Sequence, residues 1–156
     1  MRVFTIQVAR WRLAKQYGVE FLDTTVKGGY SPFAPTWDMV MGHKNGTMSD
    51  EEYKDLYWHK LVQSWKNRRE EWMKIIQDPT PVALACYCKE GAFCHRLFLV
   101  EFLRKLCKQL NEEFEYFGEL TNTPPESKEK QHHVQSDQGT VQPSPSEHRG
   151  DRPASE

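Results

Sequence analysis

The chain has 156 residues, of which 38% are apolar and 28% charged, and its formal net charge at pH 7 is −1. Apolar residues are concentrated before position 121, since residues 121–156 contain only Val134, Val141 and Ala154. Residues 1–120 carry 17 Lys and Arg against 16 Asp and Glu. A nearly neutral body disfavours proteins that hold duplex nucleic acid or a membrane surface by charge alone. We expect a single α/β domain over residues 1–120 and a disordered tail over residues 121–156.

The N-terminus and the cysteines indicate the compartment. The chain has no run of 18 apolar residues, and its first residues are too short and too polar for a signal peptide. Three of the four cysteines, at positions 86, 88, 94 and 107, fall within nine residues. Disulfides between such close neighbours would close only small loops and stabilise little. We therefore expect a cytoplasmic protein with reduced thiols and no membrane partner.

The first half of the chain predicts two strands and one long helix. Alternation of Phe4, Ile6 and Val8 with polar residues indicates a strand, residues 10–17 a short helix, and residues 19–26 a second strand that pairs with the first. Residues 30–46 contain two prolines and two glycines and are expected to form an irregular loop over a site. A capping box of Ser49 and Glu52 begins a helix that ends near residue 78, and residues 66–71 are either a break or a solvated face.

The second half continues the alternation of strands and helices. Residues 82–86 are apolar without interruption, as in a central strand buried on both faces. Residues 89–93 form a turn, residues 94–111 a second long helix, and the segment around Phe114 and Tyr116 a last short strand. This order predicts a small three-layer α/β sandwich with a mostly parallel sheet.

The residues with the most reactive and charged side chains follow two of the predicted strands. In an open parallel sheet, ligands bind at the carboxyl ends of the strands, where residues 23–29 and 86–96 are expected to lie. The second segment leads from a buried strand through a glycine-containing turn to a helix that begins with Cys94, His95 and Arg96. The helix dipole and Arg96 there favour an anion and lower the pKa of a nearby thiol.

The string Cys-Tyr-Cys-Lys-Glu-Gly-x-Phe-Cys-His-Arg, over residues 86–96, resembles the domain of unknown function 488 family in its phage-type branch. The upstream string Asp-Thr-Thr-Val-Lys-Gly-Gly supports this resemblance, which covers residues 2–120. It implies an α/β domain with its site at Cys-His-Arg and leaves the reaction open. Most members have Cys-x-Glu where this chain has Cys86-Tyr87-Cys88, so no acidic catalytic residue is carried over.

The candidate site residues follow from these segments. The candidate catalytic residues are Cys88, Cys94 and His95. The candidate ligand-binding residues are Arg96, Lys27, Asp23, Thr25, Tyr87 and Gly91. Cys86 and Cys107 are interpreted as core residues, and Tyr53 and Tyr57 more as core than as ligand platforms. No cofactor is assigned.

Alternatives remain for several of these residues. Cys86, Cys88, Cys94 and His95 are possible zinc ligands, but structural zinc sites usually use two separated pairs, so free thiols are favoured. Seven residues separate Cys88 from Arg96, against five in a phosphatase loop. Five tryptophans are too many for one small core, so some should be exposed and available for stacking.

Three functions are compatible with these observations. The leading hypothesis is an enzyme that acts on a phosphorylated ligand, a nucleotide or a nucleic acid, at the Cys-His-Arg loop. The second is a nucleotide-binding or nucleic-acid-binding module without catalysis. The third is a phage-encoded protein that binds a host factor.

Overall fold

The computed structural model describes residues 1–123, which belong to one compact unit, Met1–Glu126. Its centre is a four-stranded sheet with the order β2-β3-β1-β4, in which every neighbouring pair is parallel. The strands are β1 (Arg2–Gln7), β2 (Glu20–Asp23), β3 (Val82–Cys86) and β4 (Glu115–Glu119). The predicted α/β class with a mostly parallel sheet is confirmed. From position 124 onwards the predicted tail lies outside the described residues.

Strand β3 is central because it is apolar on both faces. All five of its residues are buried, and it pairs with β1 on one side and β2 on the other. The predicted pairing of the first two strands is therefore wrong, since β3 lies between them. The short connection from β1 to β2 favours pairing of these two strands. The wholly apolar β3 nevertheless takes the place between them, because there both of its faces are covered.

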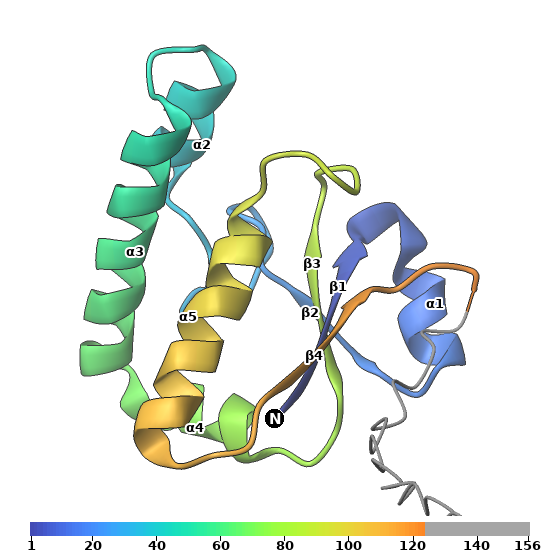
Figure 1. Ribbon diagram of the computed structural model, residues 1–156. Helices are drawn as coiled ribbons and strands as arrows, with labels where there is room; N and C mark the ends of the chain where they lie inside the picture. Colours follow the sequence, from blue (N-terminus) through green and yellow to red (C-terminus); the bar gives the residue numbers. More distant parts are fainter. Residues whose placement is uncertain (124–156) are drawn as a thin grey trace, which may run out of the picture. The chain divides into compact units, whose positions relative to one another are not determined.

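The helices cover the two faces of the sheet unequally. Figure 1 shows α1 (Trp11–Gln16) on one side and α3 (Asp50–Asn67), α4 (Arg69–Gln77) and α5 (His95–Leu110) on the other. Alternating residues of β1 serve both sides: Phe4 and Ile6 pack with Ala14 of α1, and Val3 packs with the larger helical layer. This confirms the three-layer sandwich. No helix in the described part of the chain is long and apolar enough to cross a membrane.

One predicted element needs correction, and the break that residues 66–71 leave open is present. The segment 30–46, expected to be an irregular loop, contains the helix α2 (Trp37–Lys44). Thr36, directly after Pro35, caps this helix by accepting a hydrogen bond from the Met39 N–H at 3.3 Å. The long helix after Ser49 keeps its capping box but is two helices, because the backbone breaks at Arg68. The Arg68 side chain holds this corner through two hydrogen bonds to Glu71, each 2.7 Å long.

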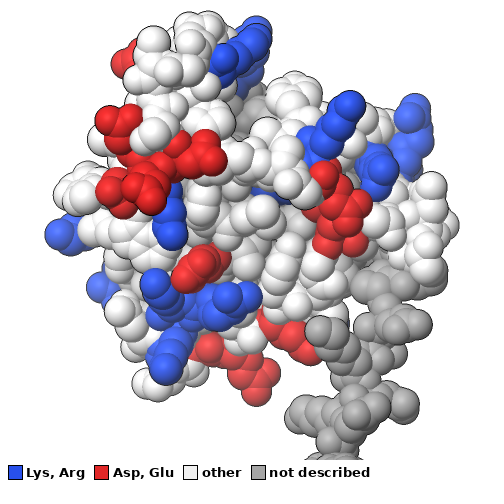
Figure 2. Space-filling view, turned by 45° about the horizontal axis from the view of Figure 1, so that its top comes forward, with Lys and Arg blue, Asp and Glu red and all other residues white. Residues whose placement is uncertain are grey.

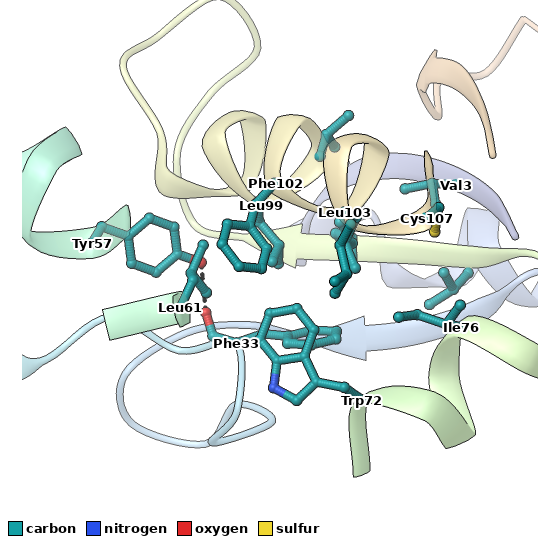
Figure 3. Close-up of a cluster of buried hydrophobic side chains, with 14 of the residues drawn as sticks. Val3, Phe33, Tyr57, Leu61, Trp72, Ile76, Leu99, Phe102, Leu103 and Cys107 are labelled. Atoms are coloured by element: carbon teal, nitrogen blue, oxygen red, sulfur yellow. Dashed lines mark hydrogen bonds between the residues drawn. The ribbon is translucent and has the colours of Figure 1, made fainter. Parts of the chain in front are cut away.

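The larger core lies between the sheet and α3, α4 and α5. In Figure 3 the Trp72 side chain of α4 packs below Leu99, Phe102 and Leu103 of α5. The Tyr57 hydroxyl of α3 donates a hydrogen bond of 2.6 Å to the Phe33 carbonyl, which satisfies its polar atom inside this core. Tyr57 and Cys107 are fully buried, so both are core residues as predicted.

Candidate functional site

A cavity of about 530 Å³ lies at the carboxyl ends of β2 and β3. Its lining comes from the segment after β2, from α2, from the start of α3 and from the turn between β3 and α5. In a parallel sheet the strand ends expose backbone groups and side chains at one edge, which is where the ligands of this architecture bind. The cavity therefore lies at the edge that the sequence predicts for the site.

Three cysteines form a cluster in the cavity wall. The sulfur atoms of Cys86, Cys88 and Cys94 all lie within 4.8 Å of one another, and those of Cys86 and Cys88 are 3.6 Å apart. Cys86 ends β3, Cys94 is the cap residue of α5, and Cys88 lies in the turn between them. Cys86 and Cys94 are buried, whereas Cys88 is partly exposed. Cys86, which the sequence indicates as a core residue, is buried and also lines the cavity.

The three thiols have different acidities because they share hydrogen bonds. Hydrogen bonds from Cys86 and Cys94 lower the pKa of Cys88 well below its usual value. Hydrogen bonds to Cys86 and, to a smaller extent, to Cys88 raise the pKa of Cys94. The hydrogen bond to Cys88 raises the pKa of Cys86. Within the cluster Cys88 is therefore the thiol that loses its proton most readily.

His95 lies next to the thiols in a fixed orientation. Its Nε2 is 2.9 Å from the Thr24 carbonyl, which only accepts, so Nε2 carries a hydrogen. Burial lowers the pKa of His95 to about 4, so the ring is neutral at pH 7 and Nδ1 is an acceptor. Nδ1 lies 3.7 Å from the Cys86 sulfur. His95 thus faces Cys86, and the predicted acid or base role stays a prediction.

The segment after β2 supplies polar groups to the cavity. Thr25 lines the cavity, and its buried hydroxyl has no hydrogen-bond partner among the described residues. Lys27 also lines it and is exposed, with its Nζ 5.7 Å from the centre of the Trp37 ring. The Trp37 side chain is 50% exposed. A cation and an aromatic ring therefore meet at one side of the cavity, next to Thr25.

Another part of the cavity wall is aromatic. His43 of α2 stacks on Phe93 with ring centres 4.3 Å apart, and Tyr53 of α3 packs edge-on against Phe93 at 5.3 Å. Lys44 of α2 also lines the cavity. No site residue is predicted at His43 or Lys44, because residues 30–46 are expected to form a loop. The signal that indicates the helix is Thr36, a favoured cap residue, three positions before Met39.

Arg96 has a different environment from the one expected. It is 2% exposed and absent from the cavity lining. Its Nη1 donates to the carbonyls of Ile6, Cys86 and Cys88 at 3.0 to 3.3 Å, and its Nη2 pairs with Glu119 at 3.2 Å. A guanidinium engaged in this way does not present its fork to a phosphate. The expectation that Arg96 binds an anion in the cavity does not fit this geometry, and Arg96 instead ties together the ends of β1, β3 and β4.

The remaining predicted residues divide between cavity and turns. Tyr87 lines the cavity and is 66% exposed. Asp23 does not line it, and its carboxylate accepts the Thr25 N–H at 2.8 Å, which shapes the turn after β2. Gly91 has a φ of +78° and serves the turn between β3 and α5. Tyr53, interpreted as a core residue, is buried and also lines the cavity.

The surface carries charges of both signs and exposed tryptophans, as the composition predicts. In the view of Figure 2 acidic and basic side chains both occur, with uncharged surface between them, so this face is not uniformly basic. Two of the five tryptophans, Trp11 and Trp37, are 45% and 50% exposed. The prediction that some tryptophans lie outside the core is confirmed, and only Trp37 of these two lines the cavity.

Fold and site together define a three-layer α/β protein with a thiol-lined cavity at the carboxyl edge of its sheet. Residues 5–106 match the family described as the active DUF488-N3 subclade. The chain therefore belongs to the DUF488 family, as its Cys-His-Arg motif predicts, and the phage-type branch stays a prediction. No curated protein and no solved structure matches the chain.

Proposed function

We propose that the protein is an enzyme that acts on a phosphorylated ligand carrying a nucleobase, a nucleotide or a nucleic-acid end, bound in the cavity. One observation carries the proposal: a single cavity brings Lys27, Lys44 and the exposed Trp37 together with the cysteine cluster. Lysines are common phosphate ligands, and an exposed indole is a stacking platform for a base. The cavity volume falls within the usual range for small-molecule sites.

The polar groups of the cavity support this ligand class. Thr25 has a buried hydroxyl without a partner among the described residues, and such groups usually pair with a ligand, a water or an ion. A sugar or phosphate oxygen would satisfy it after a rotation of the Thr25 side chain, because the hydroxyl oxygen is itself buried. The anion is held by Lys27 and Lys44 in this proposal, and not by Arg96, whose guanidinium is engaged elsewhere.

The cysteine cluster favours an enzyme over a module that only binds. Three thiols in a cavity wall contribute little to the recognition of a phosphorylated ligand, but they offer reactive chemistry at one end of it. Cys88 is the partly exposed member and therefore the one that meets the ligand.

Binding of ribonucleotides and deoxynucleotides, followed by calorimetry, tests the ligand class. A charged hydrogen bond contributes about 1.5 to 3 kcal/mol, so Lys27→Ala should weaken binding roughly tenfold to a hundredfold. Loss of base stacking in Trp37→Ala should weaken it by about 1 to 3 kcal/mol. Lys15→Ala and Trp11→Ala are the matched controls, because both side chains are exposed on α1, across the sheet, and neither lines the cavity.

Turnover of the bound nucleotide, followed by chromatography, tests catalysis. The wild-type protein should convert at least one ligand that binds, and Cys88→Ser should bind it without converting it. Binding without turnover in the wild type would leave the non-catalytic module as the function. If no nucleotide binds, or if the cavity variants bind as well as the controls do, the proposed ligand class is wrong.

A further inference from the structure

We propose that Cys86, Cys88 and Cys94 bind one Zn²⁺ ion in the wall of the cavity, with the fourth coordination position open to the cavity. The inference deepens the proposed function, because it assigns the reactive group at the end of the same site. It does not depend on the ligand being a nucleotide.

The spacing of the sulfur atoms carries the inference. With zinc–sulfur bonds of about 2.3 Å in a tetrahedral site, two thiolate sulfurs lie about 3.8 Å apart. Cys86 and Cys88 are 3.6 Å apart, and all three sulfurs lie within 4.8 Å of one another. Small movements of the side chains are therefore enough to place three sulfurs around one ion.

The backbone that carries the thiols is fixed on both sides. Cys86 belongs to the central strand, Cys94 begins α5, and the carbonyls of Cys86 and Cys88 both accept hydrogen bonds from Arg96. An ion bound to three thiolates carries a net negative charge, and the Arg96 guanidinium, which donates to the Cys86 and Cys88 carbonyls, lies close enough to the cluster to offset part of that charge. The ligands are thus held in place before the ion binds.

The open position follows from what surrounds the cluster. All three cysteines line the cavity, so an ion between them faces the space that the ligand occupies. Catalytic zinc sites typically combine three protein ligands with a water or substrate in the fourth position. His95 lies beside the cluster, with its Nε2–H held at the Thr24 carbonyl and its Nδ1 3.7 Å from the Cys86 sulfur, so it is the protein group that would fill the fourth position in a closed site. Such a zinc would polarise an oxygen of the bound ligand or lower the pKa of a bound water.

Metal analysis of the full chain, purified without chelators, tests the site directly. We expect one zinc per chain in the wild type and only background zinc in Cys88→Ser and Cys94→Ser. Cys107→Ala is the matched control and should keep one zinc, because Cys107 is buried on α5 among core residues and does not line the cavity. Circular dichroism of each variant establishes that it is folded.

A second measurement does not need a variant. Cobalt added to the metal-free wild-type protein should give thiolate-to-metal charge transfer and the visible bands of tetrahedral cobalt, and azide should shift those bands if the fourth position is open. Zinc should also slow the alkylation of Cys88 by iodoacetamide. A spectrum indifferent to azide, with metal lost in His95→Gln, would show a closed site and overturn the open position.

The zinc inference and the proposed function fail separately. Metal-free wild-type protein that takes up neither zinc nor cobalt overturns the zinc site, whatever the nucleotide measurements give. Stoichiometric zinc in a protein that binds no nucleotide upholds the zinc site and overturns the proposed ligand class.

Discussion

Replacing Arg96 by alanine should destabilise the domain strongly. The Arg96 and Glu119 side chains are 3% and 9% exposed, and the guanidinium also donates to three carbonyls at the ends of β1 and β3. Removing one partner of a buried ion pair leaves an uncompensated charge and costs about 3 to 5 kcal/mol. For a domain of this size that loss lowers the melting temperature by roughly 10 to 20 °C.

Urea unfolding followed by tryptophan fluorescence measures this free energy. Arg104→Ala is the control, because Arg104 lies on the same helix, is exposed, and lies over the face of Phe114, a contact worth about 0.5 to 1 kcal/mol. If Arg96→Ala does not fold, Arg96→Lys keeps the charge without the planar fork and should show a smaller loss. In the double variant with Glu119→Gln, the two losses should not add, since the pair is one interaction. A change of less than about 1 kcal/mol in the free energy of unfolding for Arg96→Ala would refute the structural role of Arg96 at the ends of β1, β3 and β4, and would make Arg96 a candidate anion ligand again.

Three further predictions concern other parts of the chain. The backbone hydrogen bond from Ser49 lowers the pKa of Glu52 below its usual 4.5. The stabilisation that this hydrogen bond gives the folded state is therefore fully present above the pKa of Glu52 in the unfolded chain. It is lost as the pH falls through the lower pKa of Glu52 in the folded protein. Urea unfolding at a series of pH values should therefore show Glu52→Gln less stable than the wild type at neutral pH and equal to it in acid, and a constant difference would contradict the capping box. A Cβ at Gly29 would lie 2.2 Å from the Thr25 carbonyl oxygen, whereas one at Gly28 meets its nearest atom at 3.6 Å. Gly29→Ala should thus cost about 1 to 3 kcal/mol in thermal unfolding and Gly28→Ala less than about 0.5 kcal/mol, and equal costs would show that the loop adapts. Deleting residues 124–156, which contain only three apolar residues, should leave the melting temperature nearly unchanged, and a fall of more than a few degrees would show that they pack on the domain.

The strands and the edge that carries the site could be predicted because local patterns determine them. The apolar run at residues 82–86 has one physical solution, a central strand, and the polar residues that follow it must lie at the carboxyl edge. The helix at residues 37–44 was not predictable by periodicity because it has almost no apolar face, and only its cap at Thr36 indicates it. Its contribution of His43 and Lys44 to the cavity was missed for the same reason.

The role of Arg96 could not be predicted because it depends on distant residues. An arginine at the start of a helix is compatible with anion binding, and the helix dipole favours that interpretation. Glu119 is 23 positions later and the Ile6 carbonyl 90 positions earlier, and only the strand order brings both to the guanidinium. Likewise, the approach of three sulfurs to within 4.8 Å depends on how the turn after β3 folds, which the spacing of the cysteines does not determine.

The place of β3 between β1 and β2 has a consequence for synthesis of the chain. Val3 is in register with Val82, so β1 has no neighbour until the ribosome has made residues 82–86, and β4 joins only after residue 115. At a synthesis rate of about 5 to 20 residues per second, β1 waits roughly 4 to 16 s for its first partner. During that time both edges of β1 lack a strand partner, and the sheet cannot form in a nascent chain that stalls before residue 82. Chaperone binding should therefore be concentrated on nascent chains shorter than this length.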